Sequence, residues 1–197
     1  ASTSSVTSSV SSTSSVASSS SSSVISSSSS SSSVPSFNVT VNVTGHSSTV
    51  VVTNNATESK SVTVGSSSTT FASQLSGSGY NVGWTSPAGQ TCTAPNNSGT
   101  ISGNVTVILT CKTDTYTVGG TVSGLTGSLL LTLNNGAQTY ATSTNGAWNF
   151  PTALVSGSSY SVTITTQPIN QSCSIVNAEG TVVTSNVSTI TITCSTN

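Results

Sequence analysis

Four cysteines are the residues whose spacing points most clearly to chemistry. Cys92 and Cys111 lie 19 positions apart, and Cys173 and Cys194 lie 21 positions apart. The two pairs occupy equivalent places in two copies of a repeated segment, so each pair belongs to one copy. We therefore predict the disulfides Cys92–Cys111 and Cys173–Cys194. In the chain-entropy model, loops of this length stabilise a domain by about 3 kcal/mol each.

A metal site is the alternative use of these cysteines. The sequence contains no CxxC pair, and its only histidine is His46. Structural metal sites usually bring two close pairs of ligands together. We therefore predict neither a metal nor a cofactor.

The few ionisable side chains do not form a catalytic pattern. Nucleophilic catalysis by serine would need His46 to be oriented by an acid, and the second copy has no histidine at the matching place. Glu58 lies two positions from Lys60, and Asp114 lies two positions from Lys112. This spacing predicts solvated charge pairs and not the two opposed carboxyl groups of a glycosidase. We predict that the protein is not an enzyme.

Composition excludes several classes of partner. The chain has 197 residues, of which two are basic and three acidic, and it has no methionine. So few basic side chains exclude nucleic acid, and no run approaches the roughly 18 apolar residues of a membrane span. The missing initiator predicts that a signal segment was removed and that the protein is extracellular. Sheet edges without charge are poorly protected, so we expect polymerisation or sugar to cover them.

The chain repeats itself from Phe37 and again from Tyr116. The segment FNVTVNVTGHSSTVVVTNN matches YTVGGTVSGLTGSLLLTLNN, and SGTISGNVTVILTC matches EGTVVTSNVSTITITC. Within each copy, β-branched residues alternate with serine, threonine and asparagine, and no window has helical spacing with caps. We predict two all-β antiparallel sandwiches of about seven strands, residues 37–112 and 115–197, and hairpin turns at Asn135–Gly136 and Asn145–Gly146.

Residues 115–194 resemble the immunoglobulin-like repeats of bacterial secreted and surface proteins. The resemblance rests on TYTVGGTVSGLTGSLLLTLNNG, on NGAWNF and on LVSGSSYSVTITTQP with the following SC. The first copy is more divergent and reads TVNVTGH where the second has the GGTVSGL signature. The resemblance implies tandem immunoglobulin-like modules that serve outside the cell as a spacer, stalk or assembly unit, without a particular catalytic activity.

The two tryptophans could form a platform for sugar. Trp84 alternates with Val82, which favours a core position like that of the buried tryptophan in immunoglobulin-type sandwiches. Trp148 follows the Asn145–Gly146 turn beside Phe150, and it is therefore the better candidate of the two for an exposed aromatic that contacts glycan or a partner, with a core position as an equal alternative.

The first 36 residues form a segment of different composition. They contain 24 serines, three threonines and no charge. Isolated serine tracts are flexible coils, because they bury too little apolar surface to offset the loss of conformational entropy. We therefore expect that contact with a second copy of the chain orders this tract. All five valines of the segment have even numbers, which places them on one face of an extended strand. They are Val6, Val10, Val16, Val24 and Val34.

Hydroxyl-rich sequence is also a substrate for O-linked sugar. Such sugar would add bulk and solubility to a chain with little charge. The acceptor candidates lie in the densest serine runs: Ser18, Ser19, Ser20, Ser21, Ser22, Ser26, Ser27 and Ser28.

Three functions are compatible with the sequence. The leading hypothesis is a structural subunit of an extracellular bacterial filament, in which the segment 1–36 is a donor strand for a neighbouring copy and the copies join head to tail. The second is a stalk or spacer of a surface adhesin, in which the serine tract is a linker. The third is a carbohydrate-binding module that uses Trp148.

Overall fold

The structure is a computed structural model that describes residues 33–197. The expectations about Val6, Val10, Val16 and Val24, and about the serine acceptors between 18 and 28, fall outside the described residues. Val34 is described, and it lies exposed ahead of the first strand. The described part of the chain contains two hydrophobic cores, each enclosed by two four-stranded sheets.

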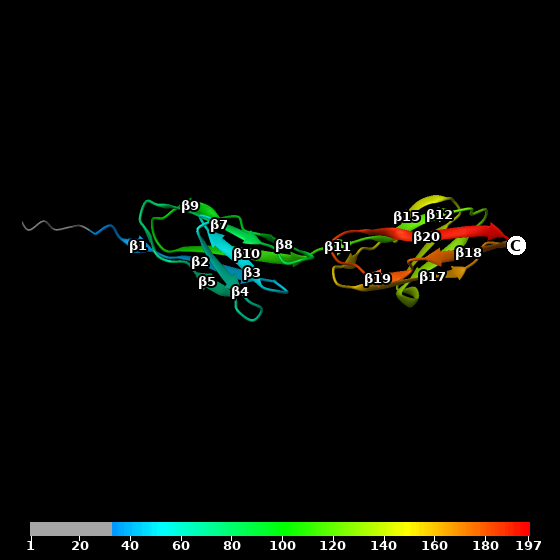
Figure 1. Ribbon diagram of the computed structural model, residues 1–197, viewed down its shortest axis with the longest axis horizontal. Coiled ribbons are helices and arrows are strands. Elements are labelled where there is room, and N and C mark those ends of the chain that lie inside the picture. The colour runs from blue at the N-terminus through cyan, green and yellow to red at the C-terminus, as the bar shows by residue number, and fades with distance from the viewer. Residues whose placement is uncertain (1–32) are drawn as a thin grey trace, which may run out of the picture. The chain divides into compact units, whose positions relative to one another are not determined.

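The first sandwich is built from ten strands, and its chain runs from blue to green in Figure 1. One sheet has the order β5-β2-β10-β8, the other has the order β4-β3-β7-β9, and β1 pairs with β6. The strands are β1 (Ser36–Phe37), β2 (Val39–Thr44), β3 (Val50–Asn54), β4 (Glu58–Val62), β5 (Ser68–Thr70), β6 (Gln74–Leu75), β7 (Gly79–Thr85), β8 (Gln90–Thr93), β9 (Ser98–Thr100) and β10 (Val105–Thr113).

Alternation along the strands creates the first core. Val39, Val41 and Val43 of β2 are buried, whereas the residues between them are at least partly accessible. On a strand, successive side chains point to opposite faces, so this spacing delivers all three valines to one side. The predicted period of two therefore describes the strand correctly.

The second sandwich repeats the first (Figure 1). Its sheets have the orders β15-β12-β20-β18 and β14-β13-β17-β19, and β11 pairs with β16. The strands are β11 (Thr115–Tyr116), β12 (Val118–Ser123), β13 (Leu129–Leu133), β14 (Gln138–Thr142), β15 (Gly146–Asn149), β16 (Leu154–Val155), β17 (Ser159–Thr166), β18 (Gln171–Val176), β19 (Glu179–Thr181) and β20 (Val187–Thr196).

The immunoglobulin-like architecture predicted from the sequence is confirmed, with two differences in detail. Each copy has ten short strands instead of about seven. The pairing is antiparallel except that β2 runs parallel to β10 and β12 runs parallel to β20. In both cases the first long strand of a copy lies beside its last strand, so the beginning and the end of each repeat are paired within one sheet.

One predicted hairpin is present and the other is wrong. Asn134 and Asn135 have positive φ angles and connect β13 to β14, which pair as a hairpin. The Asn145–Gly146 turn instead carries the chain from β14 to β15, which belong to different sheets. The reason lies in the side chain of Asn145, which accepts a hydrogen bond from Leu125 N at 2.8 Å and donates one to Leu125 O at 3.0 Å.

Both cores are complete without a strand from outside. The largest side chains of the second core, including Phe150, Leu131 and Ile190, are fully buried, as are Val107 and Leu109 in the first. The buried side chains of each core thus come from the sandwich itself, and strand donation by a second copy stays a prediction. A strand from a second copy would have to join the edge of a sheet.

Candidate functional site

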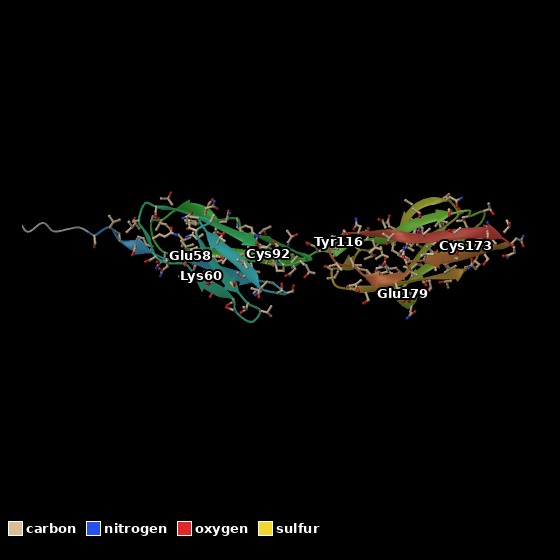
Figure 2. All side chains as sticks on the ribbon, in the orientation of Figure 1. Glu58, Lys60, Cys92, Tyr116, Cys173 and Glu179 are labelled. Carbon is tan, nitrogen blue, oxygen red and sulfur yellow. A yellow bond between two sulfur atoms is a disulfide. The ribbon has the colours of Figure 1, made fainter. Side chains whose placement is uncertain are left out.

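The charged side chains are held in structural contacts. Glu58 and Lys60 project from β4 and form an ion pair at 3.2 Å (Figure 2). The Glu58 carboxylate also accepts the N–H of Ala72 at 3.0 Å. The predicted charge pair is confirmed, and its carboxylate ties β4 to the segment that follows β5.

The second predicted charge pair is wrong. The Asp114 carboxylate accepts hydrogen bonds from the Thr91 hydroxyl at 2.8 Å and from the Tyr116 hydroxyl at 3.4 Å, and these contacts take the place of Lys112. Partial burial raises the pKa of Tyr116, and the nearby Asp114 charge and the hydrogen bond to it raise that pKa further. Thr91 of β8 lies closer to the Asp114 carboxylate than Lys112 does.

No constellation for catalysis or metal binding occurs within residues 33–197. His46 lies near the Thr63 carbonyl, 3.3 Å from its Nε2, and not near an acid. Among the described residues there is no group of three or more His, Cys, Asp or Glu side chains that could hold a metal ion. The described part of the chain also contains no helix of the length and apolar character needed to cross a membrane.

Trp148 is a core residue, which corrects its interpretation as an exposed aromatic. Its side chain is 5% exposed. The indole stacks on Tyr140 with ring centroids 5.7 Å apart and meets Phe150 edge to face at 5.4 Å. Such aromatic contacts stabilise beyond the area that they bury. Trp148 therefore fills the space between β14 and β15 and is not accessible to sugar.

Two disulfides join the predicted partners. Cys92 on β8 is bonded to Cys111 on β10, and Cys173 on β18 is bonded to Cys194 on β20. Each bridge links directly opposed residues of an edge strand and its inner neighbour. The disulfides thus fasten β8 and β18 to their sheets, and all four cysteines of the chain are used.

Side chains, instead of charge, protect these two edges. Cys173 N donates to the Gln167 side-chain oxygen at 2.8 Å, and Gln167 Nε2 donates back to Cys173 O at 2.9 Å. In the first sandwich, the Trp84 indole donates to Cys92 O at 3.1 Å, and Ser86 Oγ accepts from Cys92 N at 3.2 Å. The half-buried Trp84 packs against the core as predicted, and it also caps an edge. A strand that joined β8 or β18 would have to displace these bonds.

A pair of buried glutamines was not identified from the sequence. Gln90 and Gln171 are each 5% exposed, and each holds the loop that follows the first long strand of its sandwich. Gln171 Nε2 donates to Gly124 O at 2.8 Å, while its oxygen accepts from Thr126 N at 2.8 Å. Gln90 makes the equivalent bonds to Gly45 O and Ser47 N. The available signal was a glutamine two positions before a cysteine in both copies.

The glutamines give a testable prediction about stability. Gln171→Ala should lower the free energy of unfolding by about 2 kcal/mol, because two hydrogen bonds of about 1 kcal/mol each are lost. Gln138→Ala is the matched control, since this more accessible glutamine also makes two hydrogen bonds to backbone groups, in its case both of Thr152. Chemical denaturation should show the smaller loss for the control, and equal losses would contradict the role assigned to burial.

Four other edge strands of the four-stranded sheets contain no charged residue, namely β5, β9, β14 and β15, and of these β5 and β15 occupy the same place in the two sandwiches. β5 flanks β2 in the first sandwich, and β15 flanks β12 in the second, each as the last strand of its sheet. Neither strand contains a charged residue. Natural edge strands are commonly guarded by lysine or by inward-pointing charge. β5 and β15 are thus the candidate surfaces for pairing with another strand.

Comparisons with known proteins give distant similarities. No family model and no curated protein matches the chain. Among solved structures, the Bacillus anthracis TIE protein is 13% identical with a TM-score of 0.43, over 79% of this chain and 34% of the other. A C-terminal fragment of the pilus adhesin SpaC from Lactobacillus rhamnosus GG is 13% identical with a TM-score of 0.38, over 80% and 96%. The major pilin protein of Streptococcus pyogenes is 11% identical with a TM-score of 0.27, over 81% and 95%. The chain therefore spans about a third of the length of the first of these.

Proposed function

We propose that this protein is a structural, non-catalytic subunit of an extracellular bacterial filament. In the filament, the Ser-rich segment of one copy up to Val34 adds as a strand to an edge of another copy, whereas Ser36, the last residue of the predicted segment 1–36, pairs with Leu75 of its own copy. The observation that carries the proposal is an edge strand without charge at the same place in both sandwiches, β5 and β15, in a chain that also carries a long uncharged segment rich in serine. Strand addition supplies backbone hydrogen bonds to such an edge.

The two disulfides support a location outside the cytoplasm. Disulfides persist in oxidising compartments and are rare where thiols are kept reduced. Both bridges lie in sandwiches of fewer than 100 residues, which gain much of their stability from such links. O-linked sugar on the serine runs is part of the proposal, because the described surface has few charges to keep a polymer soluble.

The valines give the sharpest test of strand addition. Replacing Val6, Val10, Val16, Val24 and Val34 together by serine should abolish filaments in electron micrographs, because the added strand loses its apolar face. The matched control replaces Ala17 and Ile25, which have odd numbers and belong to the opposite face, and it should still assemble. Removal of residues 1–33 should leave monomers in sedimentation. Filaments formed by the deletion variant would refute strand addition.

Lysine substitutions on β5 and β15 test whether these edge strands pair with the added strand. Ala147→Lys on β15 and Ser68→Lys on β5 place a charge on each proposed edge, and both positions are exposed, so the fold should persist. Ala141→Lys, at an exposed position on β14, is the control, because β14 is an uncharged edge strand of the other sheet. The double edge variant should form fewer and shorter filaments than the control, whereas equal assembly would exclude β5 and β15.

The stalk function is favoured by one observation, namely that both cores are complete in a single copy. A spacer needs sandwiches that are stable without neighbours. If the stalk function is correct, the full chain should sediment as a monomer at every concentration tested, and the valine substitutions should leave it unchanged.

A further inference from the structure

The second sandwich contains two Asn-Gly pairs that are chemically alike. Both are followed by alanine, so the chain reads Asn135–Gly136–Ala137 at one place and Asn145–Gly146–Ala147 at the other. Glycine has no Cβ, so no side chain covers its backbone nitrogen, and this nitrogen can attack the side-chain amide of the asparagine before it. A large difference in reactivity between the two pairs would therefore come from the fold.

The amide of Asn145 is held at both of its polar atoms. Its oxygen accepts the N–H of Leu125 at 2.8 Å, and its nitrogen donates to the Leu125 carbonyl at 3.0 Å. Gly146 is the first residue of β15 and lies opposite Val122 of β12 in an antiparallel pair. An attack of Gly146 N on the amide carbon of Asn145 would require both hydrogen bonds to break and the start of β15 to leave its register.

The amide of Asn135 lies in a different environment. Asn135 belongs to the turn between β13 and β14, and residues 134–137 of this turn are all exposed. No hydrogen bond within residues 33–197 holds its side-chain amide. No heavy atom lies within 4 Å of the place that a Cβ on Gly136 would take. The Asn135 amide can therefore turn toward Gly136 N without displacing a neighbour.

The backbone of the same turn is weakly held. Asn135 has a φ of 54° and a ψ of 38°, in the left-handed region that residues with a side chain rarely adopt. The hydrogen bond from Ala137 N to Asn134 O is long, at 3.4 Å. Asn135 can thus leave its conformation and approach Gly136 N, while Asn134, whose side chain accepts Ser161 N at 2.8 Å, keeps the hairpin in place.

We propose that Asn135 is a site of spontaneous deamidation by water and that the fold protects Asn145 from the same reaction. The backbone nitrogen of Gly136 attacks Cγ of Asn135, and the new C–N bond closes a cyclic imide. The side-chain amide leaves as ammonia, which carries away the proton of the Gly136 N–H. Water then opens the imide at either carbonyl and gives aspartate or isoaspartate with release of a proton. Water is the only co-reactant, so the reaction needs no enzyme.

The modification places a charge on a part of the surface that has none. It adds one negative charge to a chain whose formal net charge is −1. The new carboxylate lies in the turn that leads into β14, an edge strand without charged residues. Charge on an edge strand opposes its pairing with another strand. The modified chain would therefore associate less readily through the edge of β14.

Incubation of the folded full-length chain in mildly alkaline buffer, below its melting temperature, tests the proposal. Digestion with chymotrypsin after Tyr140 places the two asparagines on different peptides, and mass spectrometry follows the fraction of each that becomes aspartate or isoaspartate. We expect Asn135 to react at least about tenfold faster than Asn145, a ratio that corresponds to about 1.4 kcal/mol in the barrier. Equal rates in the folded chain, or no conversion of Asn135, would overturn the proposal.

The unfolded chain is the matched control, because it keeps both sequences and removes the fold. In denaturant with both disulfides reduced, the two asparagines should react at similar rates, since glycine and alanine follow each of them. Similar rates there, together with the faster reaction of Asn135 in the folded chain, would support the protection of Asn145 by Leu125. If Asn135 kept its full advantage in the unfolded chain, the difference would come from the preceding residues, Asn134 and Thr144, and the proposed protection would be wrong.

Discussion

Gly120→Ala should prevent the second sandwich from folding while the first remains intact. Gly120 lies on β12 between Trp148 of β15 and Ile190 of β20, its register partners on either side. A methyl group at this position would overlap the carbonyl oxygen and carbon of Ile190. Backbone on an inner strand cannot retreat as a flexible side chain could, so we expect a loss of more than about 3 kcal/mol.

Gly103→Ala is the matched control for this substitution. A methyl group there would meet no heavy atom within 4 Å. Differential scanning calorimetry of the full chain should show the transition of the second sandwich lost or strongly lowered for Gly120→Ala and unchanged for the control. A single unchanged transition in both variants would mean that β12 and β20 are not packed as described.

Removing the second disulfide should produce the next largest effect. The double substitution Cys173→Ala and Cys194→Ala opens a loop with a sequence separation of 21 residues, and we expect a loss of about 3 kcal/mol. Both cysteines are buried, so a small part of the loss comes from packing. Chemical denaturation of the variant measures the loss directly.

The matched control for the disulfide lies on the same edge strand. Val176→Ala also shortens a side chain of β18, but at a position that is 59% exposed, so its effect should be within about 0.5 kcal/mol. Reducing agent opens both disulfides of the unmodified protein, and its second sandwich should then lose as much stability as in the cysteine variant. If reduction left the free energy of unfolding unchanged, the Cys173–Cys194 disulfide would not be what holds β18 to its sheet.

The repeated pattern explains why much of the fold could be predicted. Val39, Val41 and Val43 alternate with polar residues, and an alternating strand buries its apolar side whichever strand lies beside it. The disulfides could be predicted because duplication assigns each cysteine pair to one sandwich. Both inferences use information that is local or is repeated within the chain.

Features that depend on distant neighbours could not be predicted in this way. Trp148 follows a turn, which suggested exposure, but Tyr140 of another sheet covers it. Asn145 resembled a hairpin residue, yet its side chain binds Leu125. The capping of Cys173 by Gln167 likewise joins residues whose contact follows from how β17 turns into β18. In each case a contact between elements determined the role of the residue.

The protection of edges connects the fold with the proposed assembly. β8 and β18 are fastened by disulfides and capped by side chains, whereas β5 and β15 are neither. β9 and β14 are uncharged edges as well, but β5 and β15 are the edges that lack charge at the same place in both sandwiches. The same two edges would be an aggregation hazard in a chain with so little charge, unless a specific strand or sugar covers them.

Electron microscopy of the purified full-length chain tests the central claim most directly. The account predicts that the unmodified chain forms filaments. It also predicts that no filaments form when the five even-numbered valines of the Ser-rich segment are replaced by serine. Single particles at all concentrations, or filaments that are unchanged by those substitutions, would contradict it.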